Sequence, residues 1–387
     1  MGQKQNIWDD HAYTIIKARY DRRQDMANKK GQVEVTINWV YVLVAGGIIL
    51  LFFIGVIVKQ KTASEEGLAI DVVRVMENIF VGAGVSEKTK NFIDTSGISE
   101  FTLYFDCLDG VGEYGLQGKS ANVQNVIDPL FSSSTIHSPK LITWSVPYLL
   151  PFKVIDFLYV TAPNIKYYLY GQDDFIAELE KEGEEFGNII VLDGQNSYMG
   201  IDPQGNDQIR VVDISGTLVK DGFAVPEKLL SLADEKVTAL VLQGESALFF
   251  QKDAGRWHLL NTLPIPIVSL GGARDAAKLG AVFSTSPDTY QCNMGKAFLR
   301  LKNVAKVQLA RAERLAEYYD LLNPAGFCTN LISHADKNAK DTLGEMIDLL
   351  ESCTLVPEEC DYQELIPLSQ EVERINEELK VNCIALY

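Results

Sequence analysis

A glycine-rich stretch, CLDGVGEYGLQGKS, is the first candidate for chemistry, because glycines let a backbone loop cradle phosphate groups. Gly110, Gly112 and Gly115 follow a predicted strand with the spacing Gly-x-Gly-x-x-Gly. The loop also carries Asp109 and Glu113, whose negative charges would repel a pyrophosphate, and the P-loop spacing is absent. We therefore predict a hairpin turn here, with no bound nucleotide or other cofactor.

Six cysteines could bind a metal, carry redox chemistry or form disulfides. None belongs to a Cys-x-x-Cys pair or has a His at metal-ligand spacing, so neither a zinc site nor thioredoxin-like chemistry is predicted. An even count suits disulfides, and the local pair Cys353 and Cys360 is the best candidate, although six cysteines allow 15 connectivities. Buried free thiols are the alternative. The other four are Cys107, Cys292, Cys328 and Cys383.

No arrangement of residues typical of a catalytic or metal site is recognisable. The four histidines have no nucleophile or carboxylate placed around them, and the segment Gly244 to Leu248 lacks the second glycine of a nucleophile elbow. We predict no catalytic, cofactor-binding or metal-binding residue. Several aspartates near predicted strand ends are expected to bond the backbone of turns instead. They are Asp193, Asp202, Asp207, Asp213 and Asp221.

One region reverses the charge of this acidic chain, whose formal net charge is -17. A long predicted helix carries six basic residues with only Glu313 as an acid among them. This basic strip could dock on an acidic partner or on another copy of the protein. Alternatively, its residues pair with acids elsewhere in the fold. The strip consists of Lys296, Arg300, Lys302, Lys306, Arg311 and Arg314.

The overall composition limits the possible partners. A net charge of -17 argues against nucleic acid, because phosphate binding requires a basic face. A hydrophobic content of 47% is sufficient for a packed core and excludes wholesale disorder.

An uncharged apolar segment, residues 35–58, predicts one transmembrane helix, because about 20 apolar residues cross a hydrocarbon core. Trp39 and Tyr41 would lie at the interface. Basic residues concentrate before the segment, so the positive-inside rule predicts residues 1–34 in the cytoplasm and the main body outside. The sequence thus predicts a single-pass protein of the cell membrane, with the lipid bilayer as a partner.

The stretch KKGQVEVTINWVYVLVAGGIILL (Lys29 to Leu51) resembles the class III signal peptide of archaeal type IV pilin-like proteins. In that family a basic leader ends in Gly, and Gln opens the mature chain before a hydrophobic helix. The resemblance implies processing between Gly31 and Gln32. The family usually has Glu at the fifth mature position, where this chain has Thr36, and here the acid is Glu34. An uncleaved signal-anchor is the alternative.

The apolar patterns beyond this segment predict a membrane-anchored α/β (α+β) fold with one N-terminal transmembrane helix. Strands and helices alternate in the middle of the chain, and a long helix should run from about Asn293 to Leu322 before a helical tail. The predicted regions are a basic leader (1–34), the transmembrane helix (35–58), a stalk or amphipathic helix (59–99), a β-rich subdomain (100–162), an α/β domain (163–285), and the long helix with its Cys-containing tail (286–387).

Two functions remain open. The first is a non-enzymatic ectodomain with a structural or interaction role in the cell envelope, for example as a component of a pilin-like assembly. Its partners would be envelope proteins or its own copies. The second is a membrane-tethered α/β enzyme, hydrolase-like, whose site assembles from distant residues. A deep pocket with converging acids would favour the enzyme, whereas an exposed apolar or basic patch would favour the interaction protein.

Overall fold

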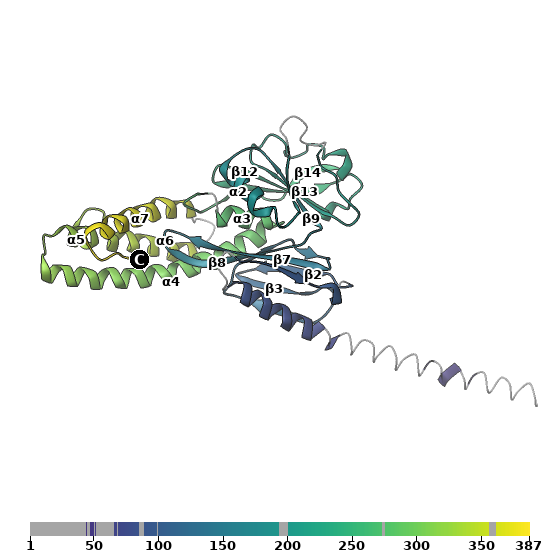
Figure 1. Cartoon of the computed structure of the whole chain (residues 1–387), viewed down its shortest axis with the longest axis horizontal. Helices are drawn as coiled ribbons and strands as arrows, with labels where there is room; N and C mark the ends of the chain where they lie inside the picture. The colour runs from purple at the N-terminus through teal and green to yellow at the C-terminus, as the bar shows by residue number, and fades with distance from the viewer. Residues whose placement is uncertain are drawn as a thin grey trace, which may run out of the picture. The chain divides into compact units, whose positions relative to one another are not determined.

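The computed structural model describes residues 69–84, 89–98, 100–192, 200–272, 275–355 and 361–387, with a few isolated positions before residue 69. The chain divides into two units, Met1–Leu68 and Ala69–Tyr387. Nearly all described residues belong to the second unit, which combines three β-sheets with a group of long helices (Figure 1).

The predicted fold class was wrong in its central feature, the membrane-spanning helix. Among the described residues, no helix combines the length and the apolar composition needed to cross a bilayer. α4 (Pro287–Leu322) is long enough, at 36 residues, but Lys and Arg recur along it and would have to enter hydrocarbon. The described part is instead a mixed α/β fold with three sheets, and this corrects the predicted single-pass cell-membrane localisation with an extracellular body.

Most of the N-terminal predictions fall outside what the structure describes. Of the apolar segment 35–58, the structure describes residues 44, 47–49 and 51. The predicted processing site, Gly31 and Gln32, lies outside the described residues. Cleavage therefore stays a prediction.

Two four-stranded sheets come from residues 90–161. The first has the order β1-β7-β8-β5 and is antiparallel except for the parallel pair β5 and β8. The second has the order β4-β3-β2-β6 and is antiparallel throughout. The strands are β1 (Lys90–Asp94), β2 (Leu103–Leu108), β3 (Val111–Leu116), β4 (Asn122–Asn125), β5 (Leu130–Ser132), β6 (Thr135–Ile136), β7 (Lys140–Leu149) and β8 (Lys153–Thr161).

The glycine-rich stretch forms the predicted hairpin, between β2 and β3. Asp109 and Gly110 both have positive φ angles, 51° and 79°, as the two central residues of a type I′ turn require. Gly115 has a different role, because a Cβ there would lie 2.6 Å from the carbonyl oxygen of Ala121. The glycines therefore serve the turn and close strand packing.

The third sheet has the order β10-β9-β11-β12-β13-β14, with β15 beside β13. Its first four strands are parallel, and the helix α2 (Asp174–Gly183), capped by Asp173, connects β9 to β10 as a βα crossover. The strands are β9 (Ile165–Tyr170), β10 (Ile189–Leu192), β11 (Gln208–Asp213), β12 (Val237–Gln243), β13 (Ser246–Asp253), β14 (Arg256–Leu259) and β15 (Ile265–Pro266).

The segment PEKLLSLADE has an apolar pattern typical of a helix, but it forms two short 3-10 turns, Glu227–Leu229 and Asp234–Lys236. The buried Lys252 explains the difference. Its Nζ donates to the carbonyl oxygens of Leu229, Leu230 and Leu232, which a helix would have bonded with its own amides.

Arg210, on β11, joins the third sheet to α3 (Ala276–Phe283). Its side chain is 1% exposed, and its guanidinium donates to the carbonyl oxygens of Ala281, Val282 and Ser284 at the C-terminus of that helix. A cation is favoured there because a helix C-terminus carries partial negative charge. Desolvation by burial nevertheless lowers the pKa of Arg210 to about 9.

Residues 69–84 form an amphipathic helix that buries Val73, Met76 and Phe80. α4 starts earlier than predicted, because Ser286 caps it and Pro287 occupies its first turn. α4 packs against α6, and α6 packs against α7 (Figure 1). The remaining helices are α5 (Phe327–Thr329), a π-helix (Asn330–His334), α6 (Ala339–Leu355) and α7 (Leu365–Asn382), with 3-10 turns at Ser96–Ile98 and Tyr362–Glu364.

Candidate partner-binding site

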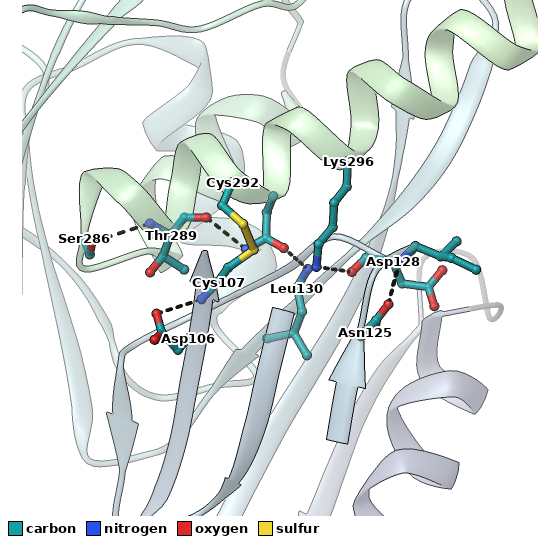
Figure 2. The surroundings of a disulfide bond; sticks show 11 residues. Asp106, Cys107, Asn125, Asp128, Leu130, Ser286, Thr289, Cys292 and Lys296 are labelled. Atoms are coloured by element: carbon teal, nitrogen blue, oxygen red, sulfur yellow. Dashed lines mark hydrogen bonds between the residues drawn. A yellow bond between two sulfur atoms is a disulfide. The ribbon is translucent and has the colours of Figure 1, made fainter. Parts of the chain in front are cut away.

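A disulfide between Cys107 on β2 and Cys292 on α4 fixes the long helix against the second sheet (Figure 2). The two Cα atoms are 5.8 Å apart, although the residues are separated by 185 positions. One residue further along α4, Asn293 accepts a hydrogen bond from the backbone N–H of Leu130 at 3.1 Å and donates to the carbonyl of Thr289 at 2.9 Å. The first turns of α4 are therefore held in a defined position beside β2 and β5.

Lys296 lies one turn beyond this disulfide and is buried. Its Nζ is 3.5 Å from the carbonyl oxygen of Asp128 (Figure 2). The side chain borders a cavity of about 10 Å³. Gly112 on β3 makes room for it, because a Cβ at that position would lie 2.6 Å from Nζ. Burial lowers the pKa of Lys296 to about 8, although the nearby Asp128 opposes this shift.

A larger groove begins on the other side of residues 125–130. We call it the β8 groove: it lies between the end of the helix 69–84, the segment 125–130, residues 153–158 of β8, and Arg300 with Val304 on α4. Its volume is about 490 Å³. The exposed apolar side chains of Val81 and Ile127 lie at its walls. The groove thus combines apolar walls with the flank of a β-strand.

The flank of β8 that faces this groove has no neighbouring strand among the described residues. β5 pairs with β8 only from Leu158 to Val160, so the stretch from Lys153 to Phe157 is paired on its β7 side alone. The Leu158 N–H donates to the carbonyl of Pro129, on the β5 side. Because backbone groups alternate sides along a regular strand, those of Asp156 point toward the groove, whereas the register with β7 shifts at Val154, which has no partner there.

The charged groups of the groove are incompletely paired. Lys153 Nζ lies 2.8 Å from Asp156 Oδ2, but the other carboxylate oxygen, Asp156 Oδ1, is buried without a hydrogen-bond partner. Arg300 is exposed and forms no ion pair or hydrogen bond with any described residue. A ligand that carries both an N–H donor and a negative charge would satisfy these groups.

The structure divides the predicted basic strip into separate environments. Lys296 is buried, and Arg300 one turn later faces the β8 groove. On another face, Lys306 pairs with Glu351 on α6 at 2.5 Å. Lys302 is half-buried and acts electrostatically on that same glutamate, Arg311 donates to the carbonyl of Ala385, and Arg314 is exposed. Partner binding by the whole strip stays a prediction.

Besides the local pair that the sequence favoured, the cysteines form bonds between distant positions. Cys328 and Cys383, 55 positions apart, form a second disulfide that ties the start of α5 to the end of α7. No described cysteine is a free thiol, which argues against the alternative of buried free thiols. Cys353 is buried in α6, but Cys360 lies outside the described residues, so their pairing stays a prediction.

Three of the five aspartates predicted to bond the backbone of turns do so. Asp213, at the end of β11, is fully buried and accepts N–H bonds from Ser215, Gly216, Leu218 and Val219. Asp207 and Asp221 also accept backbone N–H bonds, whereas Asp202 pairs with Lys228, and Asp193 lies outside the described residues. In the part of the chain that the structure describes, no three acidic, His or Cys side chains converge on a possible metal position.

The geometry therefore singles out an open strand edge, which sequence reasoning missed because pairing partners are not encoded locally. Its residues were expected to be an ordinary strand. The chain matches no protein-family model, no curated protein and no solved structure.

Proposed function

We propose that this protein is a non-enzymatic interaction protein, which binds an extended acidic peptide segment of a partner in the β8 groove. The observation that carries the proposal is the unpaired flank of β8 inside a groove. An exposed strand edge offers N–H and C=O groups at the spacing that a second strand requires, and many peptide-binding domains use this mode.

The backbone supports a short, specific contact. Asp156 presents one N–H and one C=O, so a peptide strand can form up to two backbone hydrogen bonds there. The regularly paired part of the open stretch, from Ile155 to Phe157, spans about 10 Å, which is the length of about three residues of extended peptide. The apolar walls can bury alternate side chains of that peptide.

Among the charged side chains of the groove, which also include Asp128, Lys153 and Asp156, Arg300 favours an acidic residue in the peptide. Arg300 lacks a partner among the described residues and can form a bidentate contact with a carboxylate. Asp156 Oδ1 needs a donor, which a peptide N–H can supply. These two groups lie on different walls of the groove, so one peptide can meet both.

The test uses fluorescence anisotropy with three labelled peptides: alternating Val and Glu, alternating Val and Lys, and the Val/Glu peptide with N-methylated amides. We expect saturable binding of the Val/Glu peptide and at least about tenfold weaker binding of the other two. Arg300→Glu should weaken binding of the Val/Glu peptide by a similar factor. The matched control is Lys340→Glu, because this exposed lysine at the start of α6 makes the same charge change outside the groove.

Two results would overturn the proposal. Equal binding of the N-methylated peptide would exclude strand addition, because methylation removes the N–H donors but keeps the side chains. Equal losses in the Arg300 and Lys340 variants would reduce the effect to net charge.

A further inference from the structure

The outward face of α4 carries a second feature, independent of the β8 groove. Val307, Ala310, Arg314, Glu317 and Leu321 follow one another at alternating spacings of three and four residues, and all five are exposed. Val307 is 67% and Leu321 is 89% exposed. This spacing places the five side chains on one stripe of the helix.

The opposite face of α4 is already used. Ala305, Ala312 and Ala316 are buried and belong to the main core, and α6 packs along this helix. Figure 1 shows α4 at the side of the helix group away from α7. The outward stripe therefore remains without a helical neighbour among the described residues.

The stripe is self-complementary in charge. Arg314 and Glu317, one turn apart, form no ion pair or hydrogen bond with any described residue. If two copies of α4 met antiparallel about a two-fold axis between these positions, each Arg314 would lie opposite the Glu317 of the other copy. The same axis would place each Leu321 against the other copy's Ala310, whereas each Val307 would lie opposite the residues just past the end of the other copy's α4.

We infer that a second copy of this chain covers this stripe, and that the protein forms an antiparallel α4–α4 dimer. The two central ion pairs give the register, and the flanking apolar side chains lose their exposure. A stripe from Val307 to Leu321 covers about 21 Å of helix, which is short for a stable interface, so the dimer is expected to be weak and concentration-dependent.

The test is sedimentation velocity of the full chain over a hundredfold range of concentration, with charge-reversal variants. We expect the wild type to shift from monomer to dimer as the concentration rises. Arg314→Glu and Glu317→Arg should each weaken dimerisation at least about tenfold, because like charges then face each other. The double variant R314E/E317R restores opposite charges across the axis and should recover dimerisation to within about threefold of wild type.

Arg314 and Glu317 are both exposed, so the variants should fold, and circular dichroism of each variant checks that its helix content is unchanged. A wild type that stays monomeric at every concentration would overturn the inference. So would a double variant that dimerises no better than the single ones, since this would mean that the two residues do not face each other. Arg300→Glu should leave dimerisation unchanged, and this outcome separates the dimer from the peptide site.

Discussion

Three buried cationic side chains, those of Arg210, Lys252 and Lys296, each lie against backbone carbonyl groups. Arg210 and Lys252 donate to three or more carbonyl oxygens each, whereas Lys296 has one carbonyl at 3.5 Å. Lys296 is therefore the least compensated of the three. Its burial costs stability that a neutral side chain would not.

The poor compensation of the Lys296 charge predicts that the free energy of unfolding depends on pH. The pKa of Lys296 is about 8 in the folded protein, below its ordinary value of 10.5. Between these two values the unfolded chain binds more protons than the folded one, so this residue adds stability as the pH rises through that window. We expect Lys296→Met to be more stable than wild type at pH 7 and to lose this advantage by pH 9.5. Urea denaturation at both pH values measures the difference, and parallel pH profiles would contradict it.

The basic residues of α4 show which structural features the sequence predicts and which it does not. An apolar repeat correctly indicated a helix that carries all six basic residues, but not which of them would be buried or paired. The cause lies far away in the chain: Gly112 leaves the space that Lys296 fills, and Glu351 on α6 lies where Lys306 can pair with it. Pairwise contacts of this kind are invisible to local periodicity.

At the scale of elements, the side chain of Lys252 donates hydrogen bonds to backbone carbonyls of the segment PEKLLSLADE and so stabilises a loop in place of a helix. Lys252→Met should destabilise the protein by about 3 kcal/mol, because three carbonyl groups lose their donor and Asp234 loses its ion-pair partner. The control Lys228→Met removes an exposed ion pair with Asp202 and should change the free energy of unfolding by less than about 0.5 kcal/mol. Equal effects of the two substitutions in urea denaturation would refute this role for Lys252.

Helix α4 illustrates the limits of prediction for a whole element. Its interior repeat gave its existence and its end at Leu322, while its start was placed six residues late. The signal was present, since Ser286 and Pro287 form a helix start, but it precedes the repeat. The open flank of β8 could not be foreseen, because it depends on how far β5 extends.

At the scale of the whole molecule, two described disulfides join segments that are distant in the sequence. The Cys107–Cys292 bond closes a loop of 185 positions and the Cys328–Cys383 bond one of 55. Loop-closure entropy predicts a loss of about 5 kcal/mol for C107S/C292S and about 4 kcal/mol for C328S/C383S. Urea midpoints of the two double variants test both values. A larger loss from the shorter loop would show that strain or contacts, not chain entropy, dominate.

The general α/β character was predictable, because strand and helix periods are written in the sequence. The prediction of a single-pass membrane protein was wrong, because no described helix can cross a bilayer. That prediction depended on one apolar segment, which carries no information about how the rest of the chain packs. The pairing of Cys107 with Cys292 could not be predicted from local patterns, because it follows from the packing of α4 on β2.

The long disulfide also sets an order of events during synthesis. Cys107 leaves the ribosome 185 residues before its partner, a delay of roughly 10 to 40 s at ordinary translation rates. During that interval the chain contains no other cysteine with which it could mispair. Cys328 has the opposite situation, since Cys353 and Cys360 both emerge before Cys383. The first bond can form with the first partner available, whereas the second requires Cys328 to remain unpaired or to exchange partners until the chain is complete.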